Sequence, residues 1–245
     1  IDRDGFNALM EEQRARGRAS WKTHDASWGG IAEHCRVNAI KSEFVGYDYD
    51  EAAGNPVSSV VAAIFVDGSS VESASAGADA VVVCRRTPFY AESGGQVGDT
   101  GTISGEGYLF RVSDTRKQGD DCFMHVGKVE SGVLKVGHEA GLVVNRARLD
   151  TRRNHSTTHL LHRALRQVLG THVRQRGSQV SPERLRFDFS HMAPMTRQEI
   201  EQVEKLVQGW IFDDLPIVTR EMPIEAAIAE GALHFFEDKY GESVR

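Results

Sequence analysis

Short runs of β-branched and aromatic residues, separated by glycine-rich turns, extend from about Phe44 to Val144. Half of the chain's 24 glycines lie between Gly77 and Gly141, where tight turns and bulges need them. The runs with the composition of strands are Val57–Val66, Ala80–Cys84, Val97–Ile103, Tyr108–Ser113, Cys122–Val126 and Ala140–Val144. Several short strands at this spacing predict a small closed β-barrel. Such barrels are frequent in translation proteins, although a fold alone proves no function.

After Leu149 the pattern changes to alternating helices and strands, which predicts an α+β arrangement. A helix is expected from Asp150, with an acidic or hydroxyl cap, to Gly170. One side of it carries an apolar stripe made by Leu161, Ala164, Leu165 and Val168. Apolar and polar residues alternate over Leu185–Phe189, so this run is expected to be a strand with Leu185, Phe187 and Phe189 facing inward.

Three further elements are expected towards the end of the chain. Thr196 and Glu199 form a capping box that begins a helix. The apolar stripe of that helix consists of Ile200, Val203, Leu206 and Trp210. Ile217–Arg220 has the composition of a strand, and a short helix over Ile224–Glu230 is expected between Pro223 and Gly231.

The residues ahead of the barrel predict a helical arm. Residues 2–22 are rich in Glu, Arg and Ala and carry apolar residues at roughly helical spacing. Residues 23–42 contain the pair Gly29-Gly30, which predicts a break and a loosely packed connector.

Composition narrows the class of protein. The chain has 245 residues, a net charge of −6 and 40% apolar residues, which are ordinary values for a globular protein. No apolar run approaches the roughly 20 residues that span a bilayer, so no membrane partner is expected. The three cysteines are widely spaced and predict reduced thiols in a cytoplasmic protein. The chain begins Ile1-Asp2-Arg3 without an initiator methionine, which suggests an internal fragment of a longer protein.

The segment Thr87–Gly101 is too polar for a strand and too aromatic for a plain turn. Gly94 and Gly95 precede Gln96, whose amide can both donate and accept hydrogen bonds. A glycine pair lets backbone approach a ligand closely. Composition alone favours the alternative, a barrel-corner loop with bulges.

The predicted helix from Asp150 also carries His155 and His159 on the side opposite to its apolar stripe. Four residues apart is the helical spacing at which two imidazoles converge on one metal ion. The same face carries basic residues and a further histidine, namely Arg152, Arg163, Arg166 and His162. An anionic ligand would therefore meet positive charge beside the pair, whereas the alternative is an ordinary solvated polar face.

Taken together, three segments resemble the editing region of the alanyl-tRNA synthetase family. They are the Thr87–Gly101 loop, the Arg153–Leu161 helix, and Gly177–Val180 leading to Leu185–His191. The resemblance runs in collinear order over essentially the whole chain. It implies an α+β protein with a helical connector over residues 1–42, which joins a tRNA-recognition domain. A barrel of the translation-protein type over 43–149 follows, and then an editing core over 150–245, shared by threonyl- and alanyl-tRNA synthetases.

The family hydrolyses the ester of serine or glycine wrongly attached to tRNA(Ala), while the parent enzyme ligates alanine to tRNA with ATP. By resemblance, Thr87 and Gln96 face the aminoacyl pocket. His155 and His159 bind zinc together with a Cys-x-x-x-His pair that would lie beyond Arg245. ATP and magnesium would belong to an aminoacylation domain outside this chain.

The basic residues Arg152, Arg153 and Arg166 are candidates for phosphate contacts with the acceptor end of tRNA(Ala). Three alternatives to the editing domain are a non-catalytic module that binds this acceptor end, a free-standing trans-editing protein and an unrelated zinc peptidase. The leading helical segment argues against the free-standing protein. The peptidase requires Glu directly after the first histidine, where this chain has Ser156.

Overall fold

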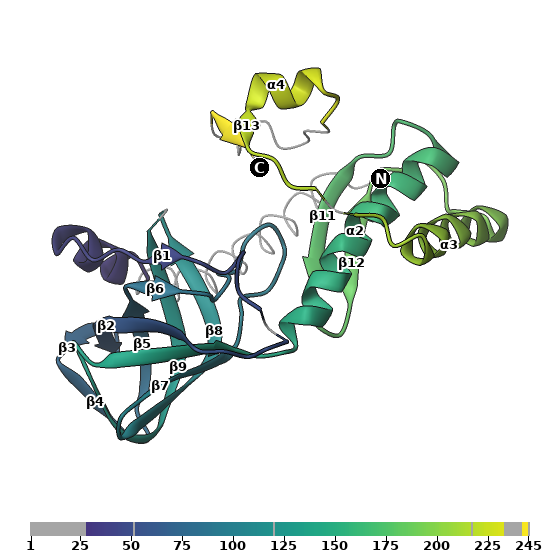
Figure 1. The fold of residues 1–245 in the computed structure, drawn as a ribbon. Coiled ribbons are helices and arrows are strands. Elements are labelled where there is room, and N and C mark those ends of the chain that lie inside the picture. The colour runs from purple at the N-terminus through teal and green to yellow at the C-terminus, as the bar shows by residue number, and fades with distance from the viewer. Residues whose placement is uncertain (1–27, 51, 120, 217, 233–241, 245) are drawn as a thin grey trace, which may run out of the picture. The chain divides into compact units, whose positions relative to one another are not determined.

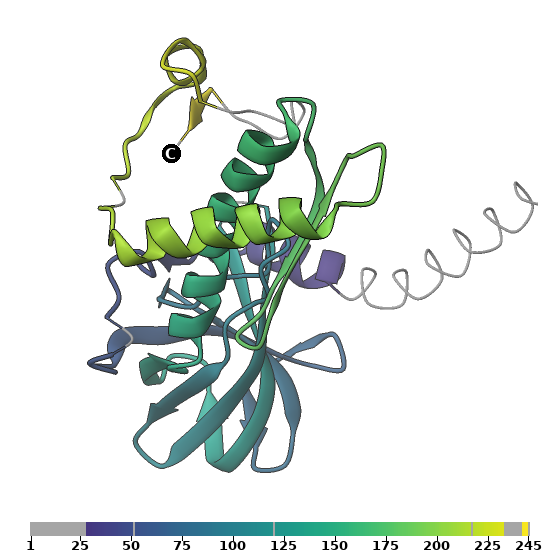
Figure 2. The ribbon, with the colours of Figure 1, turned by 90° about the vertical axis from the view of Figure 1, so that its right-hand side faces the viewer.

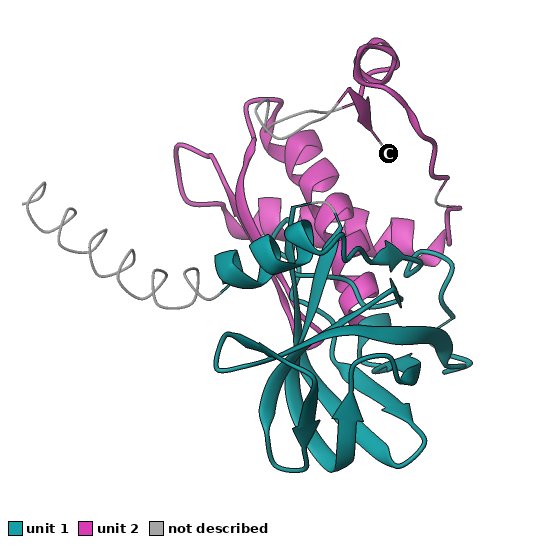
Figure 3. Ribbon diagram, turned by 90° about the vertical axis from the view of Figure 1, so that its left-hand side faces the viewer, with its two compact units in different colours: residues 1–149 teal, residues 150–245 magenta. Residues whose placement is uncertain are grey.

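The computed structural model describes residues 28–50, 52–119, 121–216, 218–232 and 242–244. The chain divides into two compact units, Ile1–Leu149 and Asp150–Arg245 (Figure 3). The helical arm predicted over residues 2–22 lies outside the described residues. No described helix is both long enough and apolar enough to cross a membrane.

Unit 1 is built around a closed β-barrel, as its glycine-punctuated strands predict (Figure 1). Among the described residues, six strands follow one another in the order β10-β7-β8-β9-β5-β2, and β10 pairs with β2 to close the ring. The strands of unit 1 are β1 Glu43–Phe44, β2 Val57–Val66, β3 Ser69–Val71, β4 Ser73–Ser75, β5 Asp79–Cys84, β6 Arg86–Thr87, β7 Gly101–Gly105, β8 Tyr108–Gln118, β9 Cys122–Lys135 and β10 Glu139–Val144. Leu142 of β10 pairs with Val57 of β2 on one side and with Ile103 of β7 on the other. Strand β10 is therefore paired along both of its edges.

Inward-facing apolar residues fill the barrel, and Ile64, Phe89, Ile103, Phe110 and Leu142 are fully buried. This packing is the main source of stability, because burying a side chain of this size contributes about 1.5 to 3 kcal/mol.

The predicted strand Val97–Ile103 is wrong in its first half, since β7 begins only at Gly101. The residues before it are held in a loop instead. Asp99 donates its backbone N–H to the carbonyl of Tyr90 and accepts the N–H of Tyr90 on its carboxylate, at 2.8 and 2.7 Å. These contacts take the place of ladder hydrogen bonds.

Residues 28–37 form a helix, so the break predicted at Gly29-Gly30 is wrong. Ile31 and Cys35 are each only 1% exposed and pack against Phe65 in a second apolar cluster. Burial of this apolar face outweighs the low helix propensity of two glycines, each of which costs about 1 kcal/mol.

Unit 2 is an α+β arrangement of two long helices and a hairpin. Its elements are α2 Arg148–Leu169, β11 Gln175–Val180, β12 Leu185–Phe189, α3 Arg197–Phe212, β13 Met222–Pro223, α4 Ile224–Ala229 and β14 Ser243–Val244. Helix α3 crosses α2 (Figure 2). Ala164 and Leu165 of α2 and Val203 of α3 are buried in the shared cluster, against which the half-buried Phe187 and Phe189 of β12 pack. The predicted apolar stripe of α2 is therefore confirmed.

The capping box at Thr196 is present in both directions, as predicted. The short helix after Pro223 also forms, over Ile224–Ala229. Two expectations are wrong. Ile200 is 43% exposed, and residues 218–220 form no strand. A helix signal or a short apolar run does not determine which neighbour a residue packs against. Tertiary packing decides whether that residue is buried or paired in a sheet.

Candidate functional site

Gly94 and Gly95 form the tip of a two-residue hairpin. The N–H of Gln96 donates to the carbonyl of Ser93 at 3.0 Å, and the N–H of Ser93 donates to the carbonyl of Gln96 at 3.2 Å. Both glycines have positive φ, 60° and 87°, as the type I′ turn of a tight hairpin requires. The turn thus accounts for the glycine pair, and it fixes the backbone of Gln96, whose side chain is buried.

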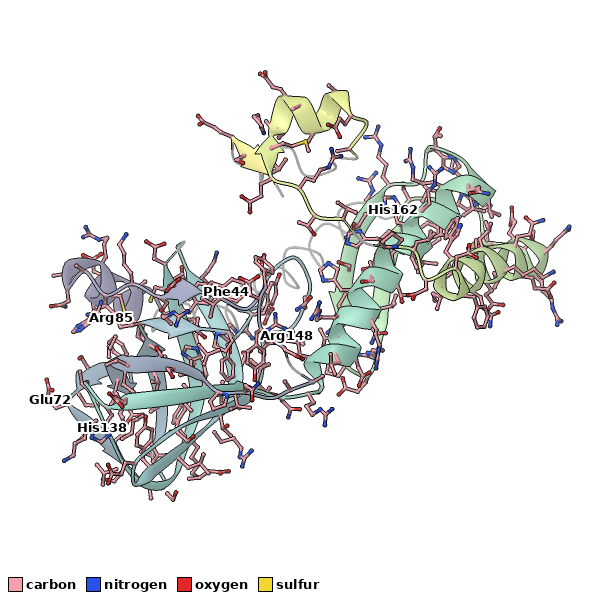
Figure 4. All side chains as sticks on the ribbon, viewed as in Figure 1. Phe44, Glu72, Arg85, His138, Arg148 and His162 are labelled. Carbon is pink, nitrogen blue, oxygen red and sulfur yellow. The ribbon has the colours of Figure 1, made fainter. Side chains whose placement is uncertain are left out.

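A buried ion pair anchors the segment that carries this turn. Nη1 of Arg148 lies 3.0 Å from Oδ2 of Asp99, and the two side chains are 6% and 4% exposed. The guanidinium also donates to the carbonyls of Pro88 and Gly46, both at 2.8 Å. Figure 4 shows Arg148 at the start of α2. A charge-assisted network of this kind holds its loop rigidly, because each partner would otherwise be buried without compensation.

Thr87 lies inside the barrel, fully buried. Its Oγ1 lies 2.7 Å from Nε2 of His125 and accepts the N–H of Phe89 at 3.1 Å. Nδ1 of His125 donates to the carbonyl of Val82 at 2.8 Å. A carbonyl can only accept, so Nδ1 carries a proton. Burial keeps the ring neutral, and Nε2 therefore accepts the Thr87 hydroxyl. Thr87 therefore positions the start of the loop, and the direct substrate contact expected of it stays a prediction.

Burial lowers the pKa of His125 from 6.5 to about 4, although its hydrogen bond with Val82 acts in the opposite direction. Between pH 4 and pH 6.5, His125 is protonated in the unfolded chain and neutral in the folded chain. We therefore expect the free energy of unfolding to be fully retained above pH 6.5 and to fall by about 3 kcal/mol as the pH drops to 4. Urea unfolding of the wild type and of His125→Gln across this range measures the difference. An equal slope in His125→Gln and the wild type would contradict the assignment.

The second set of predicted residues lies on α2 in unit 2. The rings of His155 and His159 are 5.3 Å apart between centroids and inclined by only 23°. Burial lowers the pKa of His155, and the neighbouring His159 lowers it further. A neutral imidazole has a lone pair that can bind a metal ion, and the pair has the helical spacing of two zinc ligands. Gln96 belongs to unit 1, and a pocket shared with these histidines stays a prediction.

The face around the histidine pair is only partly the basic surface that the helical wheel predicts. Arg153 is exposed and pairs with Asp150 at 2.6 Å, and Arg152 is also exposed. Arg166 donates to the carbonyls of Thr171 and Val173 at 2.8 and 2.9 Å, so its guanidinium holds the turn after the helix.

His162 differs most from the helical-wheel prediction, because it is buried on α2 (Figure 4). Its ring packs against Phe187, with 5.2 Å between the ring centroids. The expectation that it lies on the open polar face is wrong, because the β11–β12 hairpin covers that part of α2.

Comparison with known proteins shows the family to which the chain belongs. Residues 1–148 match the family model described as tRNA synthetases class II (A). The chain belongs to this family. Over its whole length it is 46% identical to the alanine--tRNA ligase of Chelativorans sp. (strain BNC1) and 48% identical to those of Sinorhizobium medicae (strain WSM419) and Rhizobium meliloti (strain 1021). It spans 27% of the length of each relative.

In this class II (A) tRNA synthetase chain, three residues of the site are not predicted from the sequence: Asp99, Arg148 and His125. Asp99 and Arg148 are 49 positions apart, and no periodicity links them. For His125 a signal exists, since it is a histidine within an otherwise apolar strand run, where an inward-facing polar group needs a buried partner.

Proposed function

We propose that this chain carries the editing site of an alanine--tRNA ligase. The site hydrolyses the ester that joins wrongly attached serine or glycine to the terminal adenosine of tRNA(Ala). Water adds to the ester carbonyl, the amino acid leaves as its free carboxylate, and the tRNA hydroxyl recovers a proton. Such a second sieve is needed because binding alone rejects a smaller or similar-sized amino acid only modestly.

The observation that carries the proposal is the histidine pair. His155 and His159 stand one helical turn apart with nearly parallel rings, and partial burial lowers the pKa of His155. His155 is half-buried on this face and His159 is exposed, so the face is only partly solvated. Together with the sequence resemblance around Arg153–Leu161, this favours a zinc site over a plain helix surface.

The donor set fits half of a tetrahedral zinc shell. His155 and His159 would hold the ion through one ring nitrogen each, and the described residues contain no cluster of three or more such ligands. Zinc at this place would supply a positive charge that orients the aminoacyl ester. Two imidazoles alone bind weakly, so the remaining ligands come from outside the described residues.

Gln96 orients the reacting groups. Its backbone is fixed by the glycine turn, and its amide can donate to the oxygen on which charge develops or hold the attacking water. Aminoacyl esters are already labile, so ordered hydrogen bonds contribute more than a strong base would. Arg152 and Arg153, exposed near the first turns of α2, contact phosphates of the acceptor end, and Arg166 adds positive charge at the far end of α2.

The test combines metal removal with hydrolysis. A protein of the relatives' full length should lose at least about tenfold of its serine release from seryl-tRNA(Ala) when a chelator removes zinc, and zinc should restore it. The 245-residue chain should keep its melting temperature in chelator, because the buried stripe of α2 does not depend on a metal.

Two results would contradict this proposal. Tight zinc binding by the 245-residue chain through its own Cys122 or His191 would refute the half-site. Tight tRNA(Ala) binding by the full-length protein without any hydrolysis would indicate the non-catalytic module that binds the acceptor end.

A further inference from the structure

Two of the three cysteines meet in the barrel unit, although they are far apart in the sequence. Cys35 belongs to helical residues 28–37 and Cys122 is the first residue of β9. Both are free thiols, 1% and 6% exposed, in the same apolar cluster. Both side chains pack in this cluster and also line the same cavity. Neither residue has a part in the proposed editing chemistry.

The segment that follows Cys35 is joined to the residue that precedes Cys122. Ser42, just after the helix, donates its N–H to the carbonyl of Asp121 at 2.7 Å. Nζ of Lys41 forms an ion pair with Oδ2 of the same Asp121, also at 2.7 Å. The residue next to Cys122 is therefore tied to the segment that follows Cys35. The two sulfurs can approach each other without separating the helix from the barrel.

A small cavity gives reagents access to the thiols. It has a volume of about 370 Å³, and both cysteines line it together with Glu33, Lys41 and Gln118. Such a volume admits a small peroxide. The cavity explains how groups that are nearly inaccessible at the surface can still be reached from one side.

We propose that Cys35 and Cys122 form a dithiol site that a hydroperoxide converts into an intramolecular disulfide between helical residues 28–37 and β9. The Cys35 thiolate attacks the peroxide and becomes a sulfenic acid, while the peroxide is reduced to an alcohol, or to water in the case of hydrogen peroxide. The Cys122 sulfur then attacks the sulfur of Cys35 and displaces water. Two electrons pass from the thiols to the peroxide, and both thiol protons end in the released products.

The order of attack follows from the environment of each sulfur. A hydrogen bond from Cys122 lowers the pKa of Cys35, against the effect of burial. The same hydrogen bond, together with burial, raises the pKa of Cys122. Cys35 is therefore the attacking thiol and Cys122 the resolving thiol.

Cys84 supplies an internal control. It is fully buried in the barrel core, and burial raises its pKa to about 12. It lies in the first apolar cluster and does not line the cavity. A peroxide that reaches thiols only by global unfolding would modify Cys84 together with the other two cysteines.

The experiment treats the folded 245-residue chain with hydrogen peroxide, blocks the remaining thiols under denaturing conditions, and identifies tryptic peptides by mass spectrometry. We expect peptide 23–36 to appear joined to peptide 118–128, with a loss of about 2 Da for the two hydrogens. The joined species should form at least about tenfold faster than any modification of Cys84, and a dithiol reductant should remove it. Oxidation should also raise the melting temperature reversibly.

Single variants separate the two roles. In Cys122→Ser, which keeps a hydrogen-bond donor beside Cys35 but has no resolving sulfur, the sulfenic acid on Cys35 should persist and be trapped by dimedone, whereas Cys35→Ala should leave Cys122 unreactive. Modification of all three cysteines at one rate in the wild type, or crosslinks that involve Cys84 or a second chain, would overturn the proposal. The wild-type measurement stands even if a single variant folds poorly.

Discussion

Replacing Arg148 with methionine should lower the free energy of unfolding of unit 1 by about 3 to 5 kcal/mol, the largest stability change we expect from a single polar residue. The substitution leaves the Asp99 carboxylate buried without its cation. It also removes the donors to the carbonyls of Pro88 and Gly46. Urea unfolding, followed by a probe of the barrel unit, measures the loss.

Two companion variants separate charge burial from other effects. Arg153→Met removes an exposed ion pair with Asp150 on the same helix and should cost at most about 1 kcal/mol. The double variant Arg148→Met with Asp99→Asn should be more stable than Arg148→Met alone, because no unpaired charge remains buried. Equal losses in Arg148→Met and Arg153→Met would show that the buried pair adds nothing.

The elements that the sequence predicts best are those whose signal is local. Alternation over Leu185–Phe189 and the stripe on α2 each report a single buried face, and both are confirmed. The short strands β1 and β6 carry no pattern of their own. They exist because Glu43 and Phe44 lie beside Arg86 and Thr87 in parallel register, a contact that only the closed barrel creates.

In the candidate site, too, local features can be predicted from the sequence and long-range contacts cannot. A helical period places His155 beside His159. The glycine pair marks the loop around Gln96 as unusual, but the hairpin turn at Gly94 and Gly95 is seen only in the structure. The partners that fix this turn come from distant positions, Arg148 above all. Sequence patterns therefore indicate which residues are chemically unusual, whereas the contacts that hold them in place follow from the tertiary fold.

Gln96→Ala should lower the hydrolysis of seryl-tRNA(Ala) by about 100-fold in a protein of the relatives' full length, as loss of one preorganised donor does in other acyl-transfer sites. The residue follows a turn whose backbone is fixed, so its amide is presented with little conformational freedom. Gln96→Met keeps the length of the side chain without the amide and should show the same loss. Gln167→Ala removes an exposed amide from α2 and should have no effect.

The most direct measurement of the editing proposal is the single-turnover rate at which the full-length protein releases serine from preformed seryl-tRNA(Ala), in the wild type and in Gln96→Ala, with melting temperatures recorded for both. Editing at this loop predicts rapid release by the wild type, a loss of about 100-fold in Gln96→Ala, and melting temperatures of both proteins well above the assay temperature. Release at the same rate by both proteins, or no release by a wild type that still binds the tRNA, would contradict it.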